Sequence, residues 1–309
     1  MKVLLRTRVY SRLRVRRRNM DLFVASIGFG LVTASVLAIA AVGFTMQFGI
    51  TQVLNLAFGS IMTLSAFVAY ALNQVGVNIW IGVVVAGVCG ALASLLLNTF
   101  LISPFKNRRT SPIAMAVVTL AAGLIIENLV LAIAGPNNVS YTLNSGPTFQ
   151  MGTFTLNVVE IVIIVISVVM MLVINAILKR SKIGKAMRAT ATNASLARAS
   201  GIRTAGVIRA TWLMTGFLCG LSGAVFAIND GSFGPSSVDL FLVVIIAAVV
   251  VGGVGRPYGA MLGALLLGLI IEVSASLINP SYKEVVAFVI LLLTLAFRPE
   301  GLLVRRQSA

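Results

Sequence analysis

The sequence contains no histidine, and only 8 of its 309 residues are acidic. These shortages remove most enzymatic arrangements, because acid–base catalysis and metal coordination draw mainly on His, Asp and Glu. The chain has no His-Glu-x-x-His pair, no Walker lysine motif and no Ser-His-Asp set. We therefore expect no catalytic residue, no metal ligand and no cofactor in this chain, which is not an enzyme by itself.

Charge of either sign is also scarce, since charged residues make up 10% of the chain against about 25% in soluble domains. Hydrophobic residues make up 59%, and the mean hydropathy is +1.03. A water-soluble fold is excluded on these grounds. Roughly 20 residues cross one bilayer, so this length accommodates about eight to ten crossings of an all-α polytopic membrane protein. The two cysteines, Cys89 and Cys219, lie in apolar segments and form no disulfide or metal-binding pattern.

The basic residues outnumber the acidic ones by 24 to 8, which gives a net charge of +16. Such an excess indicates either nucleic acid or an acidic membrane surface as a partner. The basic residues concentrate in residues 1–20, 106–109 and 179–209, between apolar runs. This is the pattern of cytoplasmic loops under the positive-inside rule, so we expect contact with membrane lipid and no nucleic acid.

Apolar runs alternate with these polar stretches along the chain. They cover residues 22–50, 53–72, 79–102, 112–134, 158–178, 207–228, 240–251, 259–278 and 285–297.

The polar stretches predict the sidedness of the protein. Residues 135–157 contain no Lys or Arg and are expected outside, whereas residues 179–209 contain eight and are expected in the cytoplasm. If residues 1–20 and 106–109 are both cytoplasmic, an even number of crossings must separate them. Three apolar runs lie between them, so one of these runs is expected not to cross the membrane. Asn55 and Gly59 make residues 53–72 the best candidate, because polar groups and glycine suit a broken or re-entrant helix. The prediction is about eight transmembrane helices plus this one, with both termini cytoplasmic. The alternative is nine crossings with one basic segment on the other side.

The predicted organisation has three parts. Residues 1–20 form a basic cytoplasmic leader, residues 21–303 form the transmembrane domain with its cytoplasmic loop 179–206, and residues 304–309 form a C-terminal tail. A cleavable signal is disfavoured, because its apolar region of about 7–15 residues is half the length of this run. Met20 is the hypothetical biological start.

Two polar segments carry functional hypotheses. In residues 49–59, Asn55 and Gly59 either line a transport pathway or mark a kinked helix packed through small residues. In the cytoplasmic loop 179–206, Asn193 is a good helix N-cap and Gly201 a good helix stop. The short helix between them, residues 194–200, needs a partner surface, so it is interpreted as a docking element. The other interpretation is a solvated loop on anionic lipid.

A third, glycine-rich segment occupies residues 250–268. It lacks the later glycine of a dinucleotide site and the Gly-Lys-Ser/Thr of a phosphate loop. A tight turn followed by close helix packing explains it better. The glycines assigned to this turn and packing are Gly252, Gly253, Gly255, Gly259 and Gly263.

Three acids lie in or near apolar runs: Glu127, Glu160 and Glu272. Glu160 is close to a predicted membrane interface. Glu127 and Glu272 lie deeper, where an ionisable side chain by default suggests function. We favour a structural role for both, since no basic residue lies near them in the sequence. Ion coupling through either remains the alternative.

Taken in order, these segments resemble the branched-chain amino acid ABC transporter permease family. The family has a glycine, five variable residues and then Asn-Phe-Ala-His-Gly. Residues 49–59 resemble this pattern, with Gly49 followed by Asn55-Leu56-Ala57-Phe58-Gly59. Residues 184–189 and 193–202 resemble its cytoplasmic loop, residues 252–255 its Gly-Gly-x-Gly turn, and residues 298–303 its ending. The similarity covers about residues 20–303. Phe58 and Leu56 replace the family's His and Phe, and Asn193 replaces a frequent acid.

The resemblance implies an import system with several subunits in a prokaryotic cell membrane. This chain and a second, paralogous permease would form the pathway for a branched-chain amino acid or a related small polar solute. An extracytoplasmic protein would bind the solute, and two cytoplasmic ATPases would hold ATP and Mg²⁺. The residues implied in ATPase coupling are Gly184, Arg188, Asn193, Ala197, Arg198 and Gly201.

Two other functions are open. One is an ion-coupled secondary transporter that uses Glu127 or Glu272, since broken helices occur in such proteins. The other is a structural membrane subunit without a transport path. A need for ATP and a separate ATPase would distinguish the importer from the ion-coupled transporter.

Overall fold

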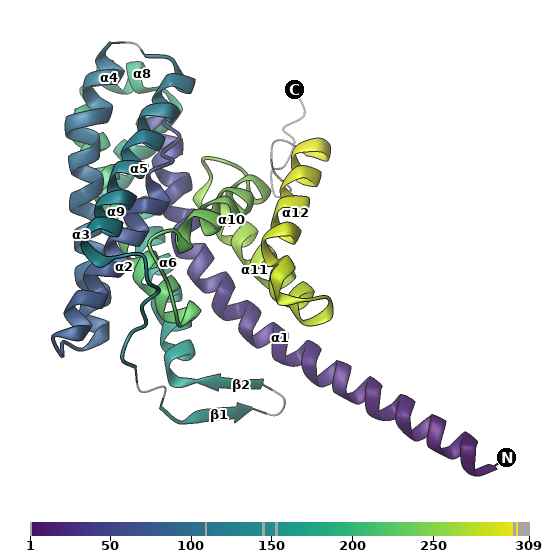
Figure 1. The fold of residues 1–309 in the computed structure, drawn as a ribbon. Helices are drawn as coiled ribbons and strands as arrows, with labels where there is room; N and C mark the ends of the chain where they lie inside the picture. Colours follow the sequence, from purple (N-terminus) through teal and green to yellow (C-terminus); the bar gives the residue numbers. More distant parts are fainter. Residues whose placement is uncertain (1, 109, 144–145, 152–153, 299–300, 302–309) are drawn as a thin grey trace.

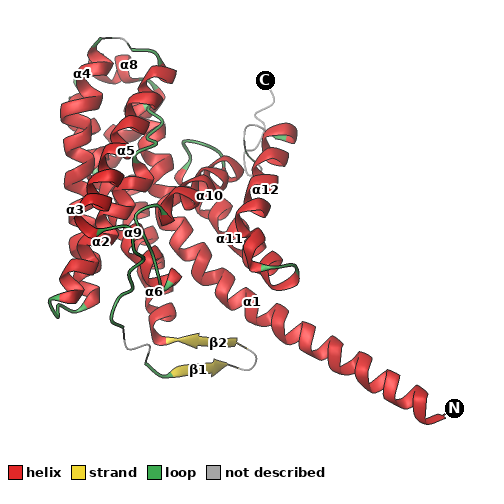
Figure 2. Ribbon diagram, in the orientation of Figure 1, coloured by secondary structure: helices red, strands yellow, loops and turns green. Residues whose placement is uncertain are grey.

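The computed structural model describes residues 2–108, 110–143, 146–151, 154–298 and 301. Almost all of this chain is helical, with one small antiparallel hairpin (Figure 2). The elements are α1 (Lys2–Thr51), α2 (Phe58–Gln74), α3 (Ile79–Leu96), the π-helical η1 (Leu97–Ile102), α4 (Ser103–Asn107), α5 (Pro112–Ala134), β1 (Thr148–Met151), β2 (Phe154–Asn157), α6 (Val158–Arg180), α7 (Lys182–Thr192), α8 (Ala194–Ala199), α9 (Thr204–Asp230), α10 (Ser237–Gly252), α11 (Pro257–Leu277), the 3₁₀ turn η2 (Pro280–Tyr282) and α12 (Lys283–Phe297).

The fold is an all-α polytopic membrane protein, as predicted. Within the described residues, seven helical segments are long and apolar enough to cross a bilayer: Ser26–Thr51, Ile79–Lys106, Pro112–Ala134, Val158–Arg180, Thr204–Asp230, Pro257–Leu277 and Pro280–Phe297. Helix α10 has 16 residues and α2 has 17, so each spans about 25 Å, slightly less than a hydrocarbon core of about 30 Å.

The bundle has two distinct ends. At the α8 end, α1 finishes beside the turn between α10 and α11, where Gly49 packs on Gly255. Lys179 at the end of α6 lies over the Tyr258 ring at the start of α11, which places α7 and α8 at this end as well (Figure 1). At the other end, called the hairpin end, Val139 pairs with Phe233 after α5 and α9, and β1 and β2 precede α6.

The start of α1 and the end of α12 lie at opposite ends of the bundle, which disagrees with the prediction that both termini are cytoplasmic. Helix α1 runs antiparallel to α11, because Gly30 packs on Leu269 while Gly49 packs on Gly255. The start of α1 therefore lies on the side of the hairpin end (Figure 1). Gly301, after α12, packs on Gly253 at the α8 end.

Residues 53–72 also run through the bundle, which corrects the re-entrant prediction. The chain breaks between Thr51 and Phe58, but α2 then continues to the hairpin end, where Asn73 accepts a hydrogen bond from the Thr142 amide at 2.8 Å. Helices α1, α2, α3, α5, α6, α9, α10, α11 and α12 thus alternate in direction, as in the nine-crossing alternative. The error came from placing the leader on the same side as residues 106–109.

Helices α1 and α9 form the centre of the bundle. In their most apolar stretches 72% and 78% of the residues are buried, compared with 11% in the segment that contains α12. Close approach at the centre depends on small residues, since a Cβ on Gly90 of α3 would collide with the backbone of Gly216 and Gly220 in α9. The outer helices therefore turn their large apolar side chains to lipid or to a partner subunit.

Candidate functional site

The break between α1 and α2 is a short extended segment with its own support. Gln52 directly follows α1, and its backbone lies in the left-handed region with a φ of 55°. Its side-chain amide donates to the Gly49 carbonyl at 3.1 Å. A bulky non-glycine residue is uncommon in this conformation. The prediction of a broken helix is therefore confirmed, and Gln52 is the residue at which it breaks.

Two distant side chains satisfy backbone groups that the break releases. The Thr119 hydroxyl in α5 accepts from the Leu56 amide at 3.1 Å and lies 3.0 Å from the Leu54 carbonyl. The Lys106 ammonium donates to the Thr51 carbonyl at 2.9 Å. Irregular backbone at membrane depth is tolerated only where such partners exist. Sequence reasoning missed both residues, because they lie more than 50 positions from the break and nothing in their local pattern marks them.

Asn55 lies inside the bundle, with 2% of its surface exposed. Its amide nitrogen is 3.4 Å from the side-chain oxygen of Gln47, which is also buried. Within the described chain, Asn55 Oδ1 and Gln47 Nε2 have no hydrogen-bond partner. Buried amides of this kind call for water or another polar group nearby. Gly59 packs on Leu242 of α10, so it shapes the contact between α2 and α10.

The loop 179–206, expected in the cytoplasm, contains the predicted capped helix. The Asn193 side chain accepts from the amides of Ser195 (3.1 Å) and Leu196 (3.0 Å), which confirms it as the N-cap of α8. Gly201 has a φ of +84°, and its amide donates to the Arg198 carbonyl at 3.0 Å, as expected of a helix stop. Helix α8 ends at Ala199, one residue before the predicted end.

The resemblance implied that Ala197 takes part in ATPase coupling, but the structure exposes a different side chain of α8. Ala197 is buried against the chain, with 4% of its surface exposed, whereas Leu196 is 64% exposed. Arg198 is also exposed. A partner would therefore meet Leu196 and Arg198 first. Leu196 was not selected from the sequence, although an apolar side chain directly after a helix cap was a usable signal.

Gly184 and Arg188 act within the chain to hold α7 on α6. A Cβ on Gly184 would collide with the carbonyls of Ile177 and Leu178. The Arg188 guanidinium donates to the Leu178 carbonyl at 2.6 Å, which satisfies a group at the end of α6. These contacts link any movement of α8 to α7 and α6.

The glycine-rich turn packs as the sequence predicted. A Cβ on Gly252 would collide with Gly259, and one on Gly263 with Ala248, so α10 and α11 touch backbone to backbone. Gly253 and Gly255 have positive φ values of 97° and 79°, which a side chain would strain.

The same turn also joins the end of α1. The Gly255 amide donates to the Thr45 hydroxyl at 2.8 Å. The turn and the helix break are thus neighbours at the α8 end of the bundle.

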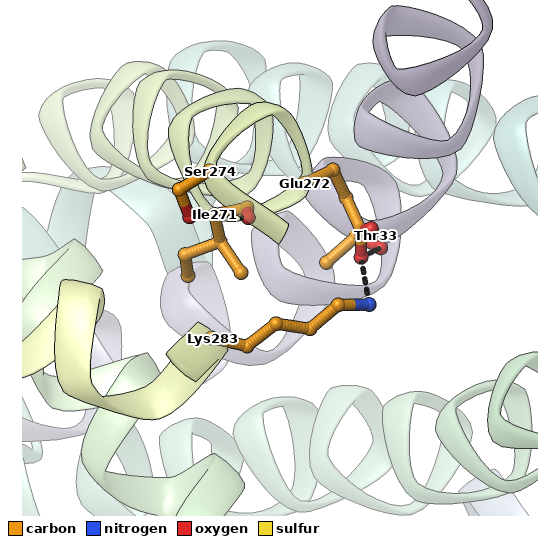
Figure 3. A network of polar contacts seen from close by, with 5 residues as sticks. All are labelled: Thr33, Ile271, Glu272, Ser274 and Lys283. Carbon is orange, nitrogen blue, oxygen red and sulfur yellow. Dashed lines mark hydrogen bonds and ion pairs between the residues drawn. The ribbon is translucent and has the colours of Figure 1, made fainter. Parts of the chain in front are cut away.

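Glu272 is paired inside the protein. Its carboxylate accepts from the Lys283 ammonium at 2.7 Å and from the Thr33 hydroxyl at 2.8 Å, which joins α11, α12 and α1 (Figure 3). Nearby in Figure 3, Ser274 bonds back to the Ile271 carbonyl of its own helix at 2.7 Å. The basic partner of Glu272 lies 11 residues away, beyond the turn. This pairing favours the structural role of Glu272 over ion coupling.

The other two acids lie toward the hairpin end. Glu127 in α5 meets Asp239 in the first turn of α10. Glu160 closes a capping box with Asn157 at the start of α6, with both bonds at 2.8 Å. In the described part of the chain no three His, Cys, Asp or Glu residues come together as a metal site would require.

An aromatic cluster fixes the loop that follows α5 at the hairpin end. Tyr141 stacks near Tyr70 and Phe233, and its hydroxyl donates to the Ala66 carbonyl at 2.9 Å. Burial raises the pKa of the Tyr141 phenol above its ordinary value, so it stays a neutral donor. The loop is therefore packed against α2 and against the segment that follows α9.

Comparison with known proteins agrees with this architecture. The family model described as branched-chain amino acid transport system / permease component matches residues 26–295. The LivH permease protein of the high-affinity branched-chain amino acid transport system of Escherichia coli is 26% identical over 295 residues, covering 92% of this chain and 96% of that protein. Its counterpart BraD of Pseudomonas aeruginosa is 26% identical, with 89% and 94% covered.

Two further similarities bear on assembly and fold. The Escherichia coli permease protein LivM of the same system is 25% identical over 86% of this chain and 67% of that protein. The solved structure titled PsaBC from Streptococcus pneumoniae in complex with Fab has a chain with a TM-score of 0.50 and 16% identity. It covers 88% of this chain and 91% of that chain, and at this identity it shows the fold alone.

Proposed function

Because the chain belongs to the branched-chain amino acid permease family and is a multi-pass permease of the cell membrane, we propose that it works in an ATP-driven importer. Its solute is a branched-chain amino acid or a related small polar molecule. A separate extracytoplasmic protein delivers the solute. ATP and Mg²⁺ bind to two cytoplasmic ATPase subunits, and this chain carries neither. The similarity to LivM supports a paralogous second permease.

The observation that carries the proposal is α8 itself. A helix of 6 residues is unstable alone, yet this one is capped at both ends and presents Leu196 and Arg198 outward. An exposed apolar side chain beside basic ones suits the groove of a soluble partner. The α8 end is then cytoplasmic, in agreement with the eight basic residues of 179–209.

The coupling route follows the contacts of α8. Helix α8 packs on α7 and α9, α7 packs on α6 and α1, and α9 packs on α1, α2 and α3. A displacement of α8 therefore reaches the helix break and the adjacent glycine turn. For transport, ATP binding must favour one arrangement of these elements over another, since a ligand shifts an equilibrium only through differential binding.

The test is uptake of L-leucine by the reconstituted complex. Wild-type uptake is expected to require ATP and to persist after an ion gradient collapses. Leu196→Glu is expected to lower uptake at least tenfold and to release the ATPase on purification. Ile183→Glu, an equally drastic change at an exposed position in α7, is the control. ATP-independent uptake driven by an ion gradient would refute the proposal, and unchanged uptake by Leu196→Glu would refute the docking role of α8.

A further inference from the structure

A groove on the side of the bundle is not explained by the proposed function. It lies between α1, α6 and α11, has a volume of about 470 Å³, and is lined almost entirely by apolar surface. Ala34, Ala38 and Ser167 are buried at its floor, while Leu172 and Leu265 are exposed at its rim. The small side chains of the floor and the large side chains of the rim form a narrow groove that fits a narrow apolar chain.

The polar atoms on the groove floor are already satisfied. The Ser167 hydroxyl donates to the Ser35 carbonyl at 2.9 Å, and the Ser35 hydroxyl donates to the Leu31 carbonyl at 2.7 Å. The hydroxyl protons of both serines are thus already used within the chain. The three helices are all membrane-crossing segments, so the groove opens at the depth of the acyl chains.

The end of the groove nearest α8 is polar and positively charged. Lys179 lies there with its ammonium 5.4 Å from the centre of the Tyr258 ring, and the Tyr258 hydroxyl donates to the Asn175 side chain at 2.7 Å. Among the described residues Lys179 has no carboxylate within ion-pair distance. Arg180 and Lys182 follow directly, and both are exposed. An anion is therefore the complementary group at this mouth.

The length of the groove matches one leaflet. From Ile164 to Lys179 along α6 the rise is about 22 Å at 1.5 Å per residue. Half of a hydrocarbon core is about 15 Å, so the apolar part covers one acyl chain and Lys179 reaches the headgroup layer. Tyrosine is common at this depth because its ring is apolar and its hydroxyl is wet.

We propose that this groove binds an anionic glycerophospholipid, with one acyl chain on the floor of small residues and the phosphate at Lys179. Basic pockets between membrane helices on the cytoplasmic side bind anionic headgroups in this way. The unpaired cation at headgroup depth favours lipid over a second permease, which would have to bury that charge against protein. The inference does not depend on which solute is transported.

The experiment places a tryptophan at the groove and measures quenching by brominated lipid. The full-length Leu265→Trp chain is reconstituted into vesicles that contain phosphatidylglycerol or phosphatidylcholine brominated in the middle of the acyl chain. Leu292→Trp on α12, 64% exposed in the parent and outside the groove, reports ordinary lipid contact. The native Trp80 and Trp212 signal is subtracted with the parent chain. Leu172→Trp, on the other rim, replaces the first reporter if that variant misfolds.

We expect the groove reporter to prefer phosphatidylglycerol about fivefold, and the α12 reporter to show almost no preference. Lys179→Gln should remove the preference, whereas Lys182→Gln, which removes an equal charge outside the groove, should leave it. Equal quenching by both lipids would overturn the anionic site. Quenching on α12 with none in the groove would mean that protein covers the groove, and it would overturn the proposal as well.

Discussion

At the scale of single residues, the helix break depends on side chains that supply hydrogen bonds to an irregular backbone. The Thr119 hydroxyl accepts a hydrogen bond from the Leu56 amide and lies within hydrogen-bond distance of the Leu54 carbonyl. The Lys106 ammonium donates to the Thr51 carbonyl. An unpaired backbone group in this setting costs about 1–3 kcal/mol, more than the net gain of an ordinary hydrogen bond. The identity of these two residues therefore matters more than their place in the sequence suggests.

Thr119→Val tests this role directly. The change keeps the shape of the side chain and removes the hydroxyl, so the break should lose about 1–3 kcal/mol. We expect a lower melting temperature of the purified chain in detergent and reduced uptake by the complex. Thr99→Val is the control, because the Thr99 hydroxyl bonds only to the Leu95 carbonyl of its own helix and is exposed. An equal loss in both variants would show that Thr119 has no special role.

At the scale of elements, α8 is a helix defined by its ends. Asn193 starts it and Gly201 stops it, and both assignments were made from the sequence because capping is a local property. The sequence did not predict which face of α8 is buried, because that depends on how α8 packs against its neighbours. Ala197, chosen from the resemblance, lies inward, while Leu196 lies outward.

Gly201→Val should damage coupling without damaging insertion. A β-branched side chain is strained at a φ of +84°, so the stop after α8 should loosen and the helix should lose its fixed orientation. We expect at least a fivefold loss of ATP-driven uptake with normal amounts of chain in the membrane. Gly206→Val is the matched control, since Gly206 is in the first turn of α9 and has open space around it. Wild-type uptake by Gly201→Val would contradict the role of this stop.

At the scale of the whole molecule, the antiparallel packing of α1 and α11 decides the topology. Gly30 on Leu269 and Gly49 on Gly255 fix the direction of α1, and the direction of every later helix follows from it. The charge-based count of crossings failed at this point. It treated the leader and residues 106–109 as equivalent basic loops, whereas the structure places residues 2–20 and 106–108 at opposite ends of the bundle.

Cysteine labelling in intact cells checks this arrangement. After Cys89 and Cys219 are replaced by alanine, Ser140→Cys at the hairpin end should react with a membrane-impermeant maleimide from outside. Ser200→Cys beside α8 should react only in inverted vesicles. An N-terminal tag should behave like Ser140→Cys, and a C-terminal tag like Ser200→Cys. Labelling of both tags from the same side would contradict the direction of α1.

The sequence by itself determined the class of the protein, most of its apolar helices, the broken helix near Asn55, the caps of α8 and the glycine turn. Each of these depends on composition or on neighbours a few residues apart. Only the tertiary structure decided that α2 runs through the bundle, that Lys283 pairs with Glu272, and that Thr119 supports the break. These depend on which helices pack together and in which direction. Leu56 and Thr119 lie 63 positions apart and carry no local signal of that contact, and Glu272 and Lys283, 11 apart, meet only because of the turn between α11 and α12.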